Sequence, residues 1–302
     1  METSIDRRIA VIGLGAMGGA MAATLNRAGW QVVGFDPSPS ARAAAEVVGV
    51  IAVDHLDSVA GMPYVVLSLP SARMVETTVP ALLNTPGTIA IIDTTTSEPE
   101  VSATMSALAT ERGSSFLDAP VSGGRDGAAT GTLSAFVGAT DEALEAGKPV
   151  LEALTGGKYD RVGGPGSGNV VKLLNNVLAA TNLVAVGEAL GIANAYGVNP
   201  TVAAASISGA SGGSTVSSAM YPKWVLSGTH DSGFSLGLMA RDAALAIEFA
   251  QSQGEQPRLL AVASSQWNEA LTVLGPSADF TEIARTVAPA ITGAGIPGQP
   301  NS

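Results

Sequence analysis

Lys172 and Asn176 stand four residues apart in an otherwise mostly apolar stretch. Residues 166–176 read Gly-Ser-Gly-Asn-Val-Val-Lys-Leu-Leu-Asn-Asn. In a helix, residues at i and i+4 share one face, so the two side chains should point the same way. Apolar neighbours disfavour the ammonium form and should lower the pKa of Lys172 towards neutrality. The stretch predicts a general acid/base with an amide beside it. The alternative is a helix lysine that snorkels to the surface.

A glycine turn lies near the start of the chain. Gly13-Leu14-Gly15-Ala16-Met17-Gly18 follows an apolar strand at 9–12 and opens a helical segment at 19–28. In that context the glycines let the backbone approach a pyrophosphate at a helix N-terminus. Asp36, at the end of the next strand, would bind the adenosine ribose hydroxyls and repel a 2′-phosphate, which favours NAD. Arg42 lies nearby but too far along to be the usual phosphate partner, so NADP stays open. The alternative is a structural turn with a surface aspartate.

These residues need a scaffold, and the chain pattern predicts one in two parts. Apolar strands at 9–12, 31–35, 50–53, 64–69, 88–92 and 115–117 alternate mostly with helices, including 98–112 with Ser97 as N-cap. Alternation predicts a parallel sheet with helices on its faces. Segments 133–137 and 158–162, separated by a helix at 141–154, resemble edge strands. Beyond residue 166 only helices are expected, at 169–196, 200–206, 214–221, 236–253, 257–269 and 280–287.

The predicted fold class is therefore an α/β Rossmann-type N-terminal domain plus an all-α C-terminal domain, joined by a long interdomain helix. We expect the first domain at 1–164, the second at 165–292 and a disordered tail at 293–302.

The composition of the chain argues against several classes of ligand and location. The chain has 302 residues, a net charge of −11, no cysteine and two histidines. The charge argues against nucleic acid, and the scarcity of ligands predicts no metal site. An anionic ligand must be held by a few cations, of which Lys172, Arg125 and Arg241 are candidates. The most apolar stretch, 177–195, contains polar interruptions and predicts a buried helix rather than a membrane span. The first residues lack the apolar core of a secretory signal, so a cytoplasmic location is expected.

Four segments, in order, make the chain similar to the β-hydroxyacid dehydrogenases, a family that includes 3-hydroxyisobutyrate dehydrogenase and tartronate semialdehyde reductase. The resemblance runs from about residue 8 to 290. Residues 13–22 resemble the cofactor signature, 118–124 (Asp-Ala-Pro-Val-Ser-Gly-Gly) the substrate loop, and 166–176 the catalytic helix. Residues 234–242 (Phe-Ser-Leu-Gly-Leu-Met-Ala-Arg-Asp) resemble the segment that closes over the nicotinamide.

The resemblance implies hydride transfer between NAD(P) and a small anionic 3-hydroxy acid or its semialdehyde. Lys172 would be the acid/base, Asn176 would orient the substrate, and Ser122, Gly123 and Gly124 would hold its carboxylate. The cofactor would be bound by Gly13, Leu14, Gly15, Ala16, Met17, Gly18, Asp36, Leu69, Pro70, Thr96 and Arg241. One departure stands out: Arg241 occupies the place of the family's lysine, and a guanidinium is planar and never neutral. It could instead form a surface ion pair with Asp242.

Two other functions fit the scaffold. An imine reductase, or a non-catalytic protein that binds the dinucleotide, would be expected to lack the lysine, so Lys172 argues against both. The substrate stays open among small hydroxy acids and aldehydes, and the glycine- and serine-rich segment 206–218 is the expected source of its selection. The apolar long helix also predicts a homodimer or homotetramer, because a helix without a broad polar face needs cover on most sides.

Overall fold

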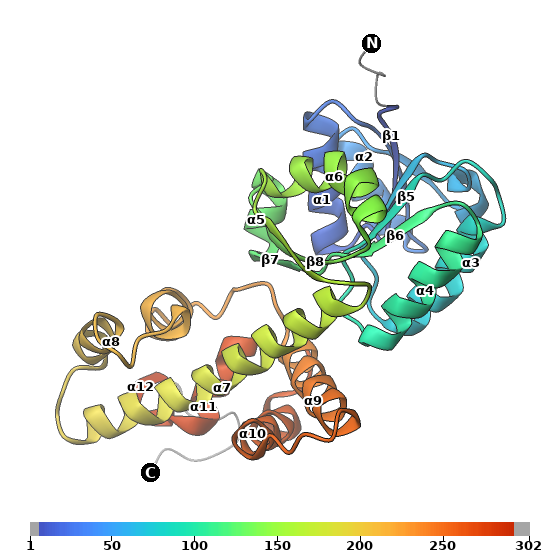
Figure 1. Cartoon of the computed structure of the whole chain (residues 1–302). Coiled ribbons are helices and arrows are strands. Elements are labelled where there is room, and N and C mark those ends of the chain that lie inside the picture. The colour runs from blue at the N-terminus through green and yellow to red at the C-terminus, as the bar shows by residue number, and fades with distance from the viewer. Residues whose placement is uncertain (1–5, 293–302) are drawn as a thin grey trace. The chain divides into compact units, whose positions relative to one another are not determined.

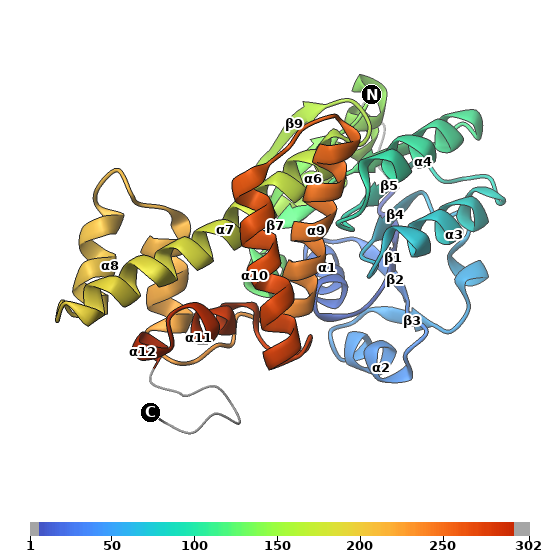
Figure 2. The same ribbon diagram turned by 90° about the horizontal axis from the view of Figure 1, so that it is seen from below.

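The computed structural model describes residues 6–292, so the tail predicted at 293–302 lies outside the described residues. The chain divides into two compact units, Met1–Lys172 and Leu173–Ser302. The first holds the sheet and its helices, and the second is helical (Figures 1 and 2). Each unit is described by itself below.

The first unit is built on a nine-stranded sheet in the order β3-β2-β1-β4-β5-β6-β8-β7, with β9 paired to β8. The first six of these strands run parallel, β8 runs antiparallel to β6 and β7, and β9 is parallel to β8. The order 3-2-1-4-5-6 is that of doubly wound dinucleotide-binding sheets. The strands are β1 (Arg8–Ile12), β2 (Gln31–Phe35), β3 (Ile51–Val53), β4 (Tyr64–Leu67), β5 (Ala90–Asp93), β6 (Ser115–Asp118), β7 (Val121–Ser122), β8 (Ser134–Gly138) and β9 (Tyr159–Gly163).

Helices cover both faces of this sheet, as the sequence pattern predicts. They are α1 (Ala16–Arg27), α2 (Pro39–Val47), α3 (Ala72–Leu83), α4 (Pro99–Glu111), α5 (Gly124–Thr130) and α6 (Asp141–Thr155), with the short helix η1 (Leu56–Val59). Alternate residues of β1 enter different cores. Ile9 and Val11 pack with residues of α1 and α6, whereas Ala10 and Ile12 pack with residues of α3 and α4. This is the period of two that a strand imposes, and here both faces are apolar because both are covered.

The second unit contains most of α7 (Ser167–Ala195) and the helices that pack on it. These are α8 (Pro200–Ser208), the π-helix η2 (Val216–Val225), α9 (Leu236–Ser252), α10 (Arg258–Leu274), η3 (Phe280–Ile283), α11 (Ala284–Val287) and α12 (Pro289–Thr292). The buried Trp267 donates its indole N–H to the Ala180 carbonyl at 3.2 Å, and Tyr221 donates its hydroxyl to the Leu183 carbonyl at 2.7 Å. These bonds tie α10 and η2 to α7.

Helix α7 is long and apolar enough, by length and composition, to cross a membrane. Its most apolar 18-residue window has a mean hydropathy of 1.5, and 39% of that window is buried within the protein. A core helix of a water-soluble protein passes the same test, so this property alone does not indicate a membrane protein.

Three local predictions differ from the structure. Strand β8 lies inside the sheet, paired with β6, β7 and β9, and is not an edge strand. Ser97 does not cap α4: the N-cap is Glu98, because Pro99 occupies the first helical position that proline favours, and Ser97 bonds to Asn169 instead. Strand β7 and helix α5 were not predicted, since α5 contains two glycines and no apolar period.

Candidate functional site

The glycine turn leaves space for a ligand at the N-terminus of α1. Gly13 has a φ of +89° and donates its N–H to the Phe35 carbonyl at 2.9 Å, which fixes the turn after β1. Gly15, the N-cap of α1, is exposed, and a Cβ added there would meet no atom within 4 Å. A Cβ at Gly18 would instead collide with the Gly13 carbonyl, so this residue brings helix and turn together. The three glycines thus match the roles of a dinucleotide-binding turn.

Asp36 is bonded into the same turn. Its Oδ2 accepts the Leu14 N–H at 2.8 Å, and its Oδ1 accepts the Ser38 N–H at 2.8 Å. The Leu14 side chain itself is buried in the core, so this residue shapes the turn through its backbone. Arg42 donates to the Asp36 carbonyl oxygen at 2.8 Å, and therefore stands closer to Asp36 than its sequence position suggests. The Arg42 guanidinium is therefore bonded to the main chain of the residue whose carboxylate is predicted to bind the adenosine ribose.

The segments that follow β4 and β5 are tied together. Thr94 donates its hydroxyl to the Leu67 carbonyl at 2.7 Å, and the hydroxyl of Thr95 accepts the Leu69 N–H at 3.1 Å. Both threonines are buried, and only Thr96 of the three reaches partial exposure. Pro70, also predicted to line the cofactor site, is exposed just after Leu69. These predicted cofactor residues therefore share one edge of the sheet with the glycine turn, where the parallel strands end.

The predicted carboxylate-binding residues form a short strand end and the start of a helix. Ser122 ends β7, pairing with Ser134 of β8. Gly123 and Gly124 follow with φ values of +120° and +60°, and Gly123 is the N-cap of α5. Both glycines are exposed, and a Cβ at Gly124 would meet nothing within 4 Å. A hydroxyl and backbone N–H groups at a helix start can together bind a carboxylate.

The start of α7 is held by a carboxylate from the sheet. Asp118, the last residue of β6, is buried and accepts the N–H groups of Gly166 at 2.7 Å and Asn169 at 2.9 Å. Burial raises the pKa of Asp118 to about 7, and those same N–H groups oppose the rise. Asn169 is fully buried and bonds to the segment before α4. The sequence did not single out either residue, although one heads the predicted substrate segment and the other lies in the predicted catalytic helix.

Lys172 and Asn176 are both buried on α7, with 9% and 6% of their surfaces exposed. Lys172 belongs to the first unit, and its low exposure is unlike that of a snorkelling surface lysine. Asn176 lies one turn further on, in the part of the helix that belongs to the second unit. Its Nδ2 donates to Oδ2 of Asp242 at 2.7 Å, and its Oδ1 accepts from Asn175 at 3.1 Å.

Asp242 links Asn176 to Arg241 within the second unit. Its Oδ1 accepts from Nε and from one terminal nitrogen of Arg241, at 3.0 and 2.7 Å. Asp242 is 1% exposed and Arg241 33%, so the pair is not the surface ion pair considered from the sequence. The carboxylate fixes which way the Asn176 amide points. The sequence identified Arg241 as a candidate site residue. The bond between Asp242 and Asn176 could be found only from the folded structure.

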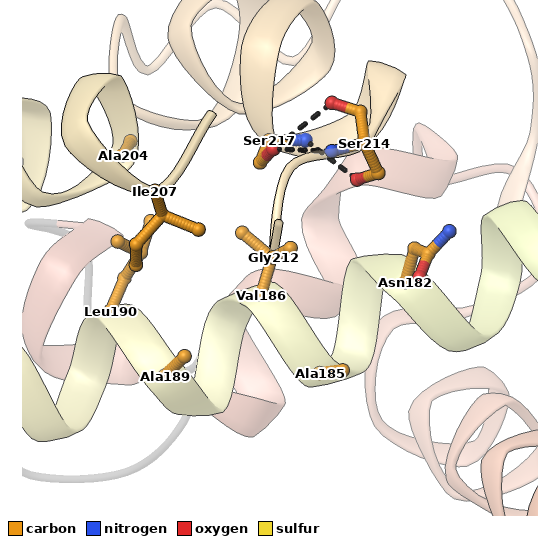
Figure 3. A pocket seen from close by; sticks show the side chains of 10 residues that line it. All are labelled: Asn182, Ala185, Val186, Ala189, Leu190, Ala204, Ile207, Gly212, Ser214 and Ser217. Atoms are coloured by element: carbon orange, nitrogen blue, oxygen red, sulfur yellow. Dashed lines mark hydrogen bonds between the residues drawn. The ribbon is translucent and has the colours of Figure 1, made fainter. Parts of the chain in front are cut away.

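A pocket of about 240 Å³ lies in the second unit, between the middle of α7 and the segment from α8 to η2 (Figure 3). Ile207, Gly212, Ser214 and Ser217 contribute to it, all from the segment expected to select the substrate. Asn182, the pocket residue nearest to Lys172 in sequence, follows it by ten residues, and Lys172 itself does not line the pocket. Among residues 6–292, no group of three or more His, Cys, Asp or Glu side chains could hold a metal ion.

Comparison with known families and proteins agrees with this arrangement. Residues 8–164 match the model of the NAD-binding domain of 6-phosphogluconate dehydrogenase, and residues 166–287 match that of the NAD-binding domain of NADP-dependent 3-hydroxyisobutyrate dehydrogenase. The chain is 33% identical to 2-(hydroxymethyl)glutarate dehydrogenase of Eubacterium barkeri, covering 99% of each protein. It is 34% identical to the NAD-dependent L-serine dehydrogenase of Pseudomonas aeruginosa, covering 94% of this chain and 98% of that protein.

A solved structure extends the similarity to three dimensions. The structure of Mycobacterium tuberculosis 3-hydroxyisobutyrate dehydrogenase with L-serine has a TM-score of 0.85 and 30% identity, covering 94% of this chain and 99% of that one. The match spans both units of the chain.

Proposed function

Because the chain belongs to the β-hydroxyacid dehydrogenase family, we propose that Lys172 is the general acid/base of a reversible 3-hydroxy acid oxidation. The relatives named above are dehydrogenases of hydroxy acids. The observation that carries the proposal is the burial of this one lysine, 9% exposed, in the first turns of α7. A buried amine exchanges protons near neutral pH more readily than a solvated one.

The residues present fit a bound dinucleotide. Gly15 leaves open space at the helix start, and Asp36 keeps acceptor capacity for ribose hydroxyls beyond its two backbone bonds. When bound, the nicotinamide accepts or supplies the hydride. We infer NAD as the preferred cofactor because the Asp36 carboxylate repels a 2′-phosphate. The neighbouring Arg42 gives NADP a cation at the same place, so the preference must be measured.

The names of the relatives suggest the substrate class. 2-(Hydroxymethyl)glutarate, L-serine and 3-hydroxyisobutyrate all contain a primary alcohol on the carbon next to the one that bears the carboxylate. They differ only in the substituent on the intervening carbon. We infer that this chain acts on the same unit: Ser122, Gly123 and Gly124 hold the carboxylate, and Asn176 orients the alcohol. Asp242 and Arg241 keep that amide in place.

In the oxidation, neutral Lys172 accepts the hydroxyl proton through Nζ while the carbinol hydrogen leaves as hydride, and a semialdehyde results. In the reduction, the ammonium of Lys172 returns the proton to the alkoxide oxygen. Because the dinucleotide would take up the hydride, the protein needs to supply a proton carrier and to hold the anion, so its contribution is positional and electrostatic.

The test is a substrate panel with matched lysine variants. The three hydroxy acids named above are each assayed with NAD and with NADP by absorbance of the reduced nicotinamide. Lys172→Ala should lower turnover by a factor on the order of 10²–10⁴, the usual contribution of a general acid or base, with dinucleotide affinity nearly unchanged. Lys158→Ala, an exposed lysine of the same unit, is the control and should keep full turnover. Full turnover by Lys172→Ala would refute the role. Turnover of cyclic imines alone would favour an imine reductase instead.

The same proposal includes location and assembly. We infer a cytoplasmic enzyme, with a dinucleotide-binding domain at 1–164 and a helical domain at 165–292, that works as a homodimer or homotetramer. Support for assembly comes from exposed apolar side chains on α7, among them Leu178 at 55% and Ile192 at 73% exposure. Such exposure on one helix is expected where another chain provides cover.

A further inference from the structure

The first turn of α7 is enclosed by three separate segments of the first unit. Asp118 comes from the end of β6, Ser97 from the segment before α4, and Phe136 from β8. Gly168 lies between them: a Cβ there would stand 2.6 Å from the Asp118 carbonyl oxygen and would also collide with the Phe136 carbonyl. The helix backbone therefore touches the sheet directly, which explains the second glycine of Gly166-Ser-Gly168.

Asp118 satisfies donors that a helix N-terminus leaves free. The first N–H groups of a helix have no partner within it, and a carboxylate there is favoured by the helix dipole. Asp118 uses one oxygen for Gly166 and the other for Asn169, at 2.7 and 2.9 Å. These partners lie 48 and 51 residues away in sequence, so the bonds fix the helix against the sheet and do more than cap it.

Asn169 holds the same turn from the other side. Its Oδ1 accepts the Ser97 N–H at 2.9 Å, and its Nδ2 donates to the hydroxyls of Ser97 at 3.3 Å and Ser102 at 3.0 Å. The side chain is fully buried, and these three bonds use both ends of its amide. Ser97 directly follows Thr96, one of the predicted cofactor-binding residues. The helix and the cofactor edge of the sheet are thus joined through one amide.

We propose that Asp118 and Asn169 are positioning residues that set the place of Lys172 by fixing the first turn of α7 to the end of β6 and to the start of α4 with the segment before it. The inference rests on the proposed role of Lys172. Lys172 follows Asn169 by three residues, about 4.5 Å along the helix axis and nearly one full turn. A helix is rigid over three residues, so a shift or tilt of the first turn displaces Lys172 by a similar amount. Misplacing a catalytic group by about 1 Å can cost on the order of 100-fold in rate.

A double-mutant cycle tests the proposal. Asn169→Ala removes all three bonds, and Asp118→Asn replaces one acceptor oxygen with a donor. Each is made alone and together with Lys172→Ala, and turnover is measured with whichever of 3-hydroxyisobutyrate or L-serine the wild-type enzyme oxidises. Ser114→Ala is the matched control, since it removes a bond to the Thr88 carbonyl at the opposite ends of the same two strands. Thermal unfolding and dinucleotide affinity are measured for every variant.

We expect Asn169→Ala and Asp118→Asn to lower kcat by about 10- to 100-fold with Lys172 present, and by less than about 3-fold in the Lys172→Ala background. Ser114→Ala should leave kcat unchanged even if it lowers the unfolding temperature. If Asn169→Ala does not fold, Ser102→Ala, which removes one of the three bonds, goes through the same cycle. An equal loss of kcat in both backgrounds would overturn the positioning role while leaving the role of Lys172 intact. Full turnover by Lys172→Ala would instead refute the proposed function itself.

Discussion

Asp93 ends β5 with a fully buried carboxyl group, one strand away from Asp118 in register. Its Oδ1 accepts the Thr95 N–H at 2.9 Å, whereas Oδ2 has no hydrogen-bond partner within residues 6–292. Burial raises the pKa of Asp93 to about 7, with a smaller contribution from the charge of Asp118, and the bonds to Thr95 oppose the rise. The folded protein therefore holds a proton that the unfolded chain releases near pH 3.8.

This difference predicts a pH-dependent stability. Between about pH 4 and 7 the unfolded state binds fewer protons, so the free energy of unfolding should fall as pH rises, by up to about 1.4 kcal/mol per pH unit for each such group. Asp93→Asn keeps the shape and removes one titration, so the slope should become shallower. Urea unfolding at several pH values in this window measures it, with the exposed Asp57→Asn as control. The idea fails if Asp93→Asn and wild type show the same slope.

The site residues predicted from the sequence are those that carry a local signal. The glycines at 13–18 follow an apolar strand and precede a helix, and Lys172 lies between apolar residues of a helix. In both cases a few neighbouring residues are enough to predict the surroundings. Asp118, Asn169 and Asp242 carry no such local pattern, because each bonds to a residue that lies 48 to 72 residues away in the sequence. Arg42 is an intermediate case: its side chain reaches back six residues to Asp36, which its position alone did not indicate.

Gly187 and Gly191 of helix α7 are four residues apart but have different surroundings. A Cβ at Gly187 would stand 2.8 Å from a methyl group of Val287 and would collide with the Tyr221 hydroxyl. A Cβ at Gly191 would meet only the Cβ of Ala288 at 3.5 Å, an ordinary contact. Gly187 thus lets η2 and α11 approach the helix closely, whereas Gly191 adds only backbone freedom.

The pair predicts opposite effects of one substitution. Gly187→Ala should lower the free energy of unfolding by about 1–3 kcal/mol, since a buried contact must open to admit the methyl group. Gly191→Ala should raise it by up to about 1 kcal/mol, because alanine favours the helix interior. Denaturant unfolding of both variants measures the difference, and a stabilised Gly187→Ala protein would contradict the packing described here.

The elements that the sequence predicts correctly are those whose pattern extends over several residues or turns. Continuous apolar runs predict β1, β4 and β5, and a long apolar segment without strand signals predicts α7. Strand β7 has two residues and α5 seven, and both depend on the antiparallel pairing with β8. Tertiary contacts, and not propensity, determine such short elements.

An apolar stripe runs along the solvent side of α7 and predicts self-association. Leu178, Ala185, Ala189 and Ile192 are all exposed, at spacings of seven, four and three residues that keep them on one side of a helix. Ala185 and Ala189 also line the pocket of Figure 3. The stripe and the pocket therefore form one apolar surface within the second unit, and we infer that a second copy of the chain covers it.

Ile192→Glu should shift the native protein towards the monomer, because a carboxylate buried in an apolar contact costs free energy without a partner. Val47→Glu, a change at an 86% exposed valine on α2 in the first unit, is the control and should leave assembly unchanged. Native mass measurement over a range of protein concentrations distinguishes these outcomes. A wild-type protein that is monomeric at every concentration would contradict the inference.

The two compact units divide inside α7, after Lys172, eight residues beyond the domain boundary predicted at 164/165. A fragment that stops at Gly164 would leave the Asp118 carboxylate and Ser97 facing no helix, and one that begins at Leu173 would lack its initiating turn. Neither half is thus a self-sufficient piece of chain. Exchanging the second unit for that of a relative would require a junction within α7, downstream of Lys172. The chimaera would then keep the first turn of the helix and its bonds to Asp118 and Ser97.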